Sequence, residues 1–397
     1  MAAKVRNILR SYDYVLALAV IALSVFGVVM VYASANSPDI PLRTATMFGD
    51  AWTRQRLYVI SGAVLMFAIS FIDYRIITRF YLYIYGLMLA LLVVVMIIGV
   101  TDATGVARWI WIRLPGVAPI SMQPSEFAKL FIIIFLAKYL DIINDKFNRI
   151  LWLLLTLVLI IVPVMLVVVQ PSLSASLVVL FTSLTILFVA GLYYRTIIIG
   201  LGLLSPVAVF AWFDMQRANP IFLTSLLGDY QWRRIEAWRD ARIDISSVIG
   251  RYQFMQTQQS LYAISSGGLT GRGFMNNSWV IHGHNDFIFS VVAEQFGFVG
   301  ALLLLLTITL IIVRCIVIAL RAPDMQGRFI AAGVAGMLIF ETFVHVGVAT
   351  NFLPNTGMPF PFMSFGGSMM WVHMMAIGVV LNIKIPRVRS IFNDEIL

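Results

Sequence analysis

The chain has 397 residues, of which 60% are apolar and only 12% are charged, and its mean hydropathy is +0.92. Soluble globular domains carry about 25% charged residues, so this composition excludes a soluble protein and indicates an integral membrane protein. The excess of 28 Lys and Arg over 19 Asp and Glu does not indicate nucleic-acid binding, because most of these charges lie in short turns between apolar runs.

Ten apolar runs approach the length of about 20 residues that a membrane-spanning helix needs. The first follows three basic residues, as a signal peptide does, but it is longer than a signal core, so we expect it to be retained as a span. The sequence predicts an all-α polytopic membrane protein with ten transmembrane helices. The runs are 14–32, 57–72, 80–100, 120–140, 150–169, 173–192, 196–213, 287–313, 329–350 and 365–383.

The distribution of Lys and Arg predicts the orientation, because cytoplasmic loops are enriched in these residues. The short connections on the opposite side hold only Arg43, Arg54, Arg56, Arg108 and Arg113. We therefore expect both termini in the cytoplasm, as an even number of spans requires. The fifteen basic residues on the cytoplasmic side are Lys4, Arg6, Arg10, Arg75, Arg79, Lys138, Lys146, Arg149, Arg195, Arg314, Arg321, Arg328, Lys384, Arg387 and Arg389.

One long polar segment, 214–286, separates the seventh and eighth predicted spans. We expect it to be a large extracytoplasmic loop within a single integral membrane domain covering residues 1–397. Within it, the stretch 232–239 has the pattern of an interfacial amphipathic helix, and a partner-binding surface is the alternative.

Ionisable residues inside predicted spans are costly in a membrane and are therefore functional candidates. Glu126 and Lys129 are three residues apart, which places them on one helical face where they can pair. They are either a structural ion pair or part of a site. Glu294 is either a hydrogen-bonding partner between helices or a proton-transfer group. Glu341 shares a helical face with a histidine four residues later, and such pairs commonly join transmembrane helices.

Asp286 lies at the membrane boundary, where proximity to apolar surface can raise the pKa of a carboxyl group. The pattern His282-x-His284-x-Asp286 is half of a metallohydrolase motif. A hydrolytic metal site needs at least three protein ligands, and the single cysteine, Cys315, offers neither a disulfide nor a cysteine metal cluster. We therefore predict no metal site.

Two Gly- and Pro-rich segments, 267–273 and 353–368, lie near the predicted outer ends of spans eight and ten. Glycine lets the backbone approach a ligand closely, and proline fixes the shape of a loop. Membrane re-entry turns are the alternative explanation.

Taken in order, these segments resemble the SEDS family (shape, elongation, division and sporulation), which includes RodA and FtsW. The resemblance covers nearly the whole chain, and the family's architecture is ten spans with one large outer loop before the eighth. It is carried by Gly105–Ile110, Gln123–Leu130, Gln258–Ser260 with Gly267–Leu269, Asp286–Phe289 with Glu294–Gly297, and Pro359–Ser368.

The resemblance implies an inverting peptidoglycan glycosyltransferase in the bacterial cytoplasmic membrane, which polymerises lipid II on the outer face. Lipid II is a disaccharide-peptide linked to undecaprenyl pyrophosphate, and the implied partner is a class B penicillin-binding protein. The family needs no certain cofactor, although a divalent cation is a candidate. The sequence 356–362 resembles RodA more than FtsW, so we expect a role in cell elongation and shape.

The resemblance also implies roles for individual residues. Asp286 matches the family's essential aspartate and is the candidate general base. Arg108 and Lys129 are candidates for binding the pyrophosphate, and Trp109 for lining the groove for lipid or sugar. Glu126 is expected to hold Lys129. The last residue of the 353–368 segment, Ser368, completes the predicted substrate-binding set.

The chain departs from the family pattern at several positions. Of the family's Pro-Glu-x-His-Thr before the aspartate only His284 is retained, Ser172 replaces an acidic residue, and His345 stands where asparagine is common. These losses make a second hypothesis credible, a non-catalytic scaffold that activates the penicillin-binding protein, although the enzyme remains the leading interpretation. A third is a lipid II flippase, since buried charges could form a polar route, although the paired broken helices of transporters are not seen.

Overall fold

The computed structural model describes residues 12–36, 50–101, 107–112, 120–170, 172–217, 224, 229–239, 248–276, 280 and 282–385. Several residues named above lie outside these ranges: Lys4, Arg6, Arg10, Arg43, Gly105, Val106, Arg113, Arg387 and Arg389.

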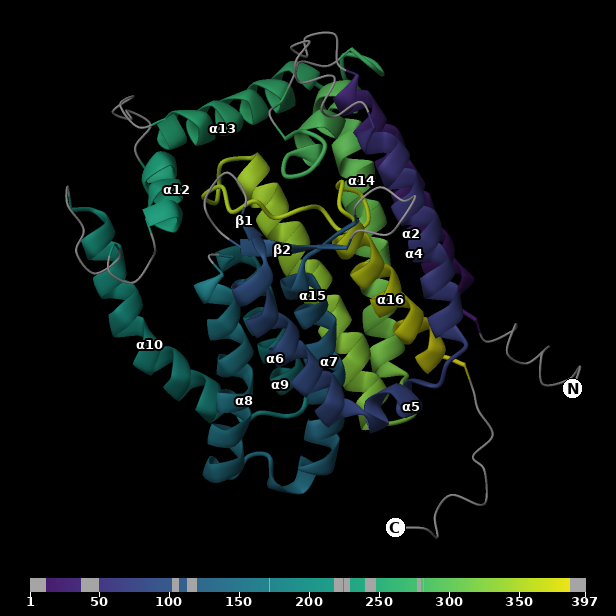
Figure 1. Cartoon of the computed structure of the whole chain (residues 1–397), viewed down its shortest axis with the longest axis vertical. Helices are drawn as coiled ribbons and strands as arrows, with labels where there is room; N and C mark the ends of the chain where they lie inside the picture. Colours follow the sequence, from purple (N-terminus) through teal and green to yellow (C-terminus); the bar gives the residue numbers. More distant parts are fainter. Residues whose placement is uncertain are drawn as a thin grey trace, which may run out of the picture.

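Helices dominate the described part of the chain, in agreement with the composition (Figure 1). The first half contains α2 (Tyr14–Ala35), α4 (Ala51–Ser70), α5 (Tyr74–Arg79), α6 (Tyr81–Ile98), α7 (Pro124–Ile142), the 3-10 turn η1 (Asn144–Lys146), α8 (Ile150–Val169) and α9 (Leu173–Val189). The second half contains α10 (Tyr194–Met215), α12 (Asp229–Arg239), α13 (Val248–Gly267), α14 (Ile288–Leu320), α15 (Met325–Ala349) and α16 (Gly367–Ile383).

Each of the ten predicted apolar runs lies largely within one of these helices. Within the described residues, six helices are by themselves long and apolar enough to cross a membrane, namely α2, α6, α8, α10, α14 and α15. Helices α9 and α16 are apolar but shorter. The chain is therefore a mostly helical, multi-pass membrane protein.

The prediction of an all-α chain needs one correction, because the connection before α7 forms a small antiparallel sheet. Strands β1 (Val100–Thr101), β2 (Ala107–Ile112) and β3 (Ile120–Met122) pair in the order β1-β2-β3. Ile110 pairs with Met122 and Ile112 with Ile120. Since β3 occupies the start of the fourth predicted span, α7 begins only at Pro124, a residue type favoured in the first helical turn.

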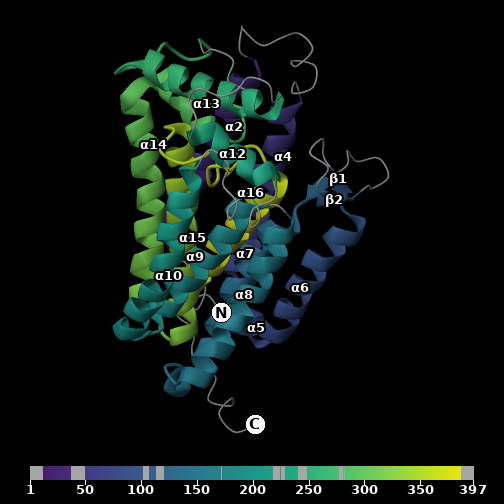
Figure 2. The same ribbon diagram turned by 90° about the vertical axis from the view of Figure 1, so that its left-hand side faces the viewer.

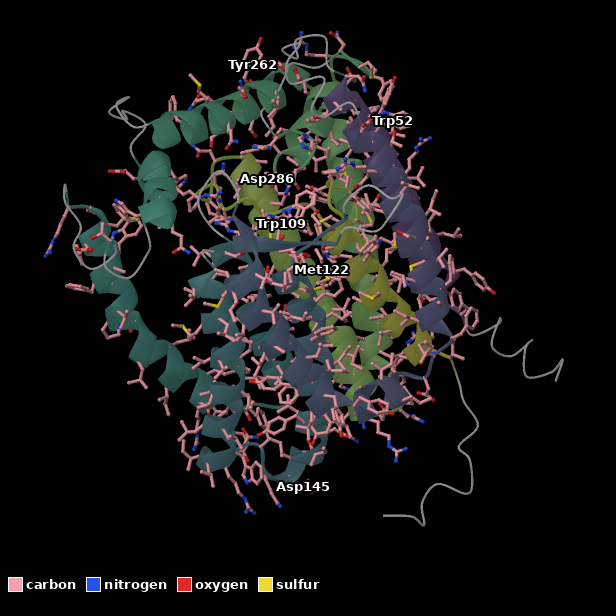
Figure 3. All side chains as sticks on the ribbon, viewed as in Figure 1. Trp52, Trp109, Met122, Asp145, Tyr262 and Asp286 are labelled. Carbon is pink, nitrogen blue, oxygen red and sulfur yellow. The ribbon has the colours of Figure 1, made fainter. Side chains whose placement is uncertain are left out.

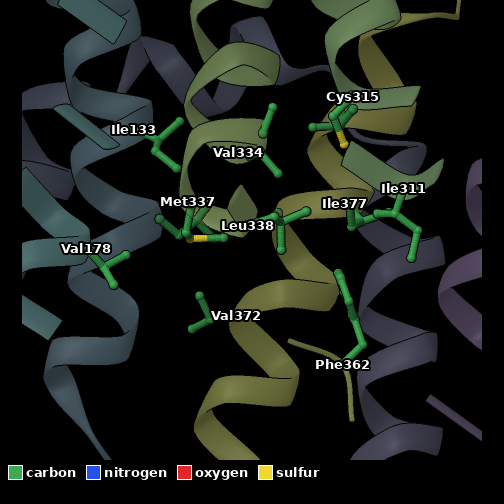
Figure 4. Close-up of a cluster of buried hydrophobic side chains, with 14 of the residues drawn as sticks. Ile133, Val178, Ile311, Cys315, Val334, Met337, Leu338, Phe362, Val372 and Ile377 are labelled. Atoms are coloured by element: carbon green, nitrogen blue, oxygen red, sulfur yellow. The ribbon is translucent and has the colours of Figure 1, made fainter. Parts of the chain in front are cut away.

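Helix α15 lies at the centre of the bundle, where it packs against α7, α9, α14 and α16. Small residues permit this close approach, as is usual between membrane helices. A Cβ atom at Gly333 would lie 2.8 Å from Ile186 Cδ1, and one at Gly336 would lie 2.6 Å from Thr185 Oγ1. Figure 4 shows buried apolar side chains from α7, α9, α14, α15 and α16 that converge on this centre.

The two helices of the long polar segment are placed across one end of the bundle. Figures 1 and 2 both show α13 running across the ends of the longer helices, and in Figure 1 α12 lies below the left end of α13 at the side of the bundle. In Figure 3, Asp286 and Trp109 are labelled toward this end, and Asp145 at the opposite end. This separation agrees with the two sides that the charge distribution predicts.

Candidate functional site

Asp286 lies in the turn that leads into α14. Hydrogen bonds from the Gly- and Pro-rich segment 353–368 hold this turn in place. The Ser364 hydroxyl donates to the Asn285 carbonyl oxygen at 2.6 Å, and the Phe365 amide donates to the His284 carbonyl oxygen at 2.9 Å. One of the two Gly- and Pro-rich segments thus packs directly against the turn of the predicted base. Its role is to position Asp286.

The Asp286 carboxylate and the Arg234 guanidinium converge on Gly357. A Cβ atom at this glycine would lie 3.4 Å from Asp286 Oδ2 and 3.3 Å from Arg234 Nη1. Gly357 has a φ of 69°, a conformation that side chains rarely adopt. Glycine at this position therefore leaves space for an anion and a cation to face the same point.

Arg234 was not predicted as a site residue, and it belongs to α12 in the long polar segment. Its Nη1 donates to the Asn355 carbonyl oxygen at 3.1 Å, and Trp238 Nε1 donates to the Asn351 carbonyl oxygen at 3.1 Å. The spacing of Arg234 and Trp238 by four residues places both on one face of α12. The stretch 232–239 is thus part of a helix, one of the two alternatives that the sequence left open, and this face binds the chain's own 351–355 segment.

The electrostatic environment of Asp286 favours the protonated carboxyl group. Burial raises the pKa of Asp286, and the opposing influence of His282 and Arg234 does not cancel this rise. Burial also lowers the pKa of His284 to about 4, with a smaller contribution from His282. A carboxylate with a raised pKa is a stronger proton acceptor than an ordinary aspartate.

Lys129 lies in a fully buried chain of charges between helices. Its Nζ is 2.6 Å from Glu126 Oε2 and 2.6 Å from Glu341 Oε1, and Glu341 Oε2 is 2.5 Å from His373 Nε2. The pairing of Glu126 with Lys129 is confirmed. Lys129 is 0% exposed and its ammonium group is engaged by two carboxylates, so this geometry favours a role in helix packing, and binding of a pyrophosphate stays a prediction.

Ser368 is also buried and engaged within the protein. Its Oγ accepts from the Gln123 amide at 3.0 Å and donates to the Ser121 carbonyl oxygen at 3.2 Å. These bonds join α16 to the junction of β3 and α7. Ser368 thus supports this junction, and its predicted contact with substrate stays a prediction.

Arg108 and Trp109 lie on β2, and both side chains are half-buried. Val100 on β1 pairs with Trp109. Trp109 lies toward the same end of the bundle as Asp286 (Figure 3). Among the predicted substrate-binding residues, these two are the ones with partly exposed side chains, although Nε and Nη2 of Arg108 are buried.

Glu294 and the segment 267–273 form a second structural unit. Arg272 Nη1 lies 3.0 Å from Glu294 Oε1, and the Arg272 amide donates to the Glu294 carbonyl oxygen at 2.9 Å. α14 breaks at Gly297, where φ is 65° and ψ is −163°. A Cβ at Gly271 would lie 2.1 Å from the Gln295 carbonyl oxygen. The absence of side chains at these glycines thus lets the backbone of α14 pack against them. We call the segment 267–273 together with Glu294 the glycine clasp.

The ring nitrogens of His345 bond to groups outside its own helix, although His345 shares a helical face with Glu341. Its Nδ1 lies 2.7 Å from the Met358 carbonyl oxygen, so it fixes the same segment that holds the Asp286 turn. Among the described residues, no three His, Cys, Asp or Glu side chains are arranged to hold a metal ion.

Comparison with known families matches residues 14–388 to the FtsW/RodA/SpoVE cell cycle proteins. The chain belongs to this family. FtsW of Trichlorobacter lovleyi, named a probable peptidoglycan glycosyltransferase, is 31% identical over 95% of this chain and 94% of its own. The peptidoglycan glycosyltransferase MrdB of Escherichia coli K12 is 30% identical over 94% of both chains.

Solved structures agree with this assignment. The chain resembles a protein in a structure titled as the coordination of polymerization and crosslinking by a peptidoglycan synthase complex, with a TM-score of 0.76, 29% identity and coverage of 96% of this chain and 99% of that one. It also resembles the rod shape determining protein RodA of Thermus thermophilus, with a TM-score of 0.65, 28% identity and coverage of 94% and 96%. These findings confirm the family that the motifs indicated.

Proposed function

We propose that this protein is a peptidoglycan glycosyltransferase that polymerises lipid II at the end of the bundle where Asp286 lies. The observation that carries the proposal is the convergence of the Asp286 carboxylate and the Arg234 guanidinium on Gly357. The names of the FtsW and MrdB relatives support the reaction class.

The chemistry requires one base and one site for a leaving anion. The sugar 4-hydroxyl of one lipid II attacks the anomeric carbon of another chain's terminal sugar. The new glycosidic bond forms as the bond to undecaprenyl pyrophosphate breaks, with inversion at that carbon. Asp286 accepts the hydroxyl proton, and its raised pKa suits this role.

The leaving pyrophosphate develops negative charge that cationic side chains can stabilise. We assign this role to Arg108 and Arg234, because an arginine fork binds phosphate oxygens bidentately. Trp109 on the same strand lines the groove for lipid or sugar. Glu126, Lys129 and Ser368 hold the helices that carry these groups.

The topology follows from the charge distribution. We propose ten transmembrane helices in one domain, with both termini in the cytoplasm and the segment 214–286 on the outer face. The opposite placement of Asp145 and Asp286 in the bundle supports this orientation (Figure 3).

The partner that we propose is a class B penicillin-binding protein, which crosslinks the strands. A structural neighbour described as a peptidoglycan synthase complex supports such an assembly. A role in elongation is the finer proposal, supported by the RodA neighbour, whereas the FtsW relatives favour division. Metal dependence is tested by adding a chelator to the reaction.

The decisive experiment is polymerisation of purified lipid II by the protein copurified with its partner, with transpeptidation blocked by a β-lactam. Wild type is compared with Asp286→Ala and with Asp50→Ala, an exposed aspartate before α4 that makes no side-chain cap. We expect glycan chains from wild type and Asp50→Ala but not from Asp286→Ala. Polymer from Asp286→Ala would remove Asp286 as the base, and its absence in all three intact complexes would favour the scaffold.

A further inference from the structure

A charged cavity lies at the opposite end of the bundle from Asp286. Its volume is about 340 Å³, and its lining comes from four places in the sequence. These are the start of α2, the turn between α4 and α5, the end of α14 and the end of α16. None of these residues has a role in the proposed glycosyl transfer.

Cations outnumber carboxylates in this lining. Arg75, Arg314, Arg321 and Lys384 face two acidic residues, Asp13 and Asp73. Since an arginine or lysine near a membrane surface attracts anionic headgroups, this balance favours a phosphate-bearing ligand.

Asp13 organises two of the cations without neutralising both. Its carboxylate is 1% exposed, and Oδ2 accepts from Arg314 Nη2 at 2.5 Å and from Lys384 Nζ at 3.1 Å. One carboxylate between two cations leaves a net positive charge. Arg75 is paired with Asp324 at 2.8 Å, so the surplus is concentrated between α14 and the end of α16.

Apolar side chains form part of the lining. Val317, Ile318, Ile383 and Ile385 line the cavity together with Tyr74, Pro323 and Asn382. Next in sequence to the lining residue Arg321, Leu320 is 73% exposed, and Val15, two residues after Asp13, is 50% exposed. An apolar wall next to a group of cations matches an amphiphile, whose phosphate is charged and whose glycerol and acyl parts are apolar.

We propose that this cavity binds the phosphate headgroup of an anionic phospholipid in the leaflet at that end of the protein. The apolar residues in the lining, together with exposed apolar residues adjacent to it in sequence, favour a lipid over free phosphate. Basic pockets between membrane helices bind lipid headgroups by the same combination of charge and shape. The proposal depends on residues other than Asp286 and stands or fails independently of the glycosyltransferase activity.

The test is a binding measurement on the purified full-length protein in a neutral detergent. The probes are a short-chain phosphatidylglycerol, a phosphatidylcholine of equal chain length and inorganic phosphate. We expect phosphatidylglycerol to raise the unfolding temperature saturably, with little change from phosphatidylcholine.

Two variants and a matched control locate the site. Arg321→Gln removes an exposed cation and should weaken phosphatidylglycerol binding about fivefold, from about 1 kcal/mol per basic residue. Arg314→Gln should weaken it at least as much, while Asp13 keeps Lys384 as a partner. Arg149→Gln, an exposed arginine before α8 at the same end, should leave binding unchanged.

Three outcomes would overturn the proposal. Equal stabilisation by phosphatidylcholine would show that charge is not recognised. Equal stabilisation by inorganic phosphate would identify a soluble anion as the ligand in place of a lipid. Unchanged phosphatidylglycerol affinity in Arg321→Gln and Arg314→Gln, with both variants folded, would place lipid binding elsewhere.

Discussion

Two groups of charged side chains in this protein have opposite accessibility. The linked side chains of Lys129, Glu341 and His373 are buried between helices, and Glu341 lies 2.6 Å from Lys129 Nζ and 2.5 Å from His373 Nε2. Asp286 and Arg234 are half-buried and meet at Gly357, which has no side chain. Charges of the first kind join helices, whereas those of the second kind can meet a substrate.

The largest effect that we expect is on stability, from Lys129→Met. Removing the ammonium leaves Glu126 and Glu341 buried without their cation, which costs about 3–5 kcal/mol. The free energy of unfolding in detergent measures this loss of stability. Lys138→Met is the control, because its pair with Asp141 lies on the same helix, three residues apart and partly exposed, and should cost less than about 1 kcal/mol. Equal losses would contradict the distinction between the two groups.

A smaller effect is expected from Gly357→Ala, on activity. The methyl group would occupy the space between Arg234 and Asp286 and should reduce lipid II polymerisation about 10- to 100-fold, because small displacements of reacting groups are costly. Gly268→Ala introduces a side chain at a similar φ of 55°, but into open space. It should retain activity. If both variants lose activity equally, backbone strain explains the loss.

Ser368→Ala tests whether the buried serine supports the fold or contacts substrate. Losing its bonds to Gln123 and Ser121 should lower the free energy of unfolding by about 1–2 kcal/mol and leave the KM for lipid II unchanged. Ser183→Ala provides the control, since that hydroxyl donates only within its own helix, to the Val179 carbonyl oxygen. A raised KM with unchanged stability would return Ser368 to the substrate site.

The smallest expected change is in the pH dependence of polymerisation. Asp286 acts as a base only when deprotonated, so activity should rise with pH through its raised pKa. Arg234 lowers that pKa, and Arg234→Gln should therefore move the acid limb to higher pH. Arg217→Gln, on an arginine that is 58% exposed, should not move it. A shift to lower pH would contradict this assignment of charges.

The sequence predicts the helices well because apolar run length and helix length obey the same physical limit. It also predicts the pairing of Glu126 with Lys129, because three residues of separation fix their relative position on a helix. The contact of Lys129 with Glu341 bridges 212 residues and has no local pattern. The sheet was missed because its strands are two to six residues long.

Arg234 was missed for a different reason. Its position depends on where α12 folds, and that depends on side-chain bonds to carbonyl groups at Asn351 and Asn355. The Gly-rich segment 267–273 was correctly singled out, but its close approach is to the backbone of α14. Glycine in a sequence indicates that something comes near, and only the fold identifies what it is.

The glycine clasp also reduces the number of backbone conformations available to the segment that carries Asp286. Backbone bonds from Arg272 to Glu294 and from Gly273 to Gln295 close a ring around the intervening residues. Shortening the closed loop from the 73 residues of segment 214–286 to about 20 lowers the entropic cost of closing it by about 1 kcal/mol. The clasp therefore lowers the entropy that ordering the aspartate costs, before any ligand arrives.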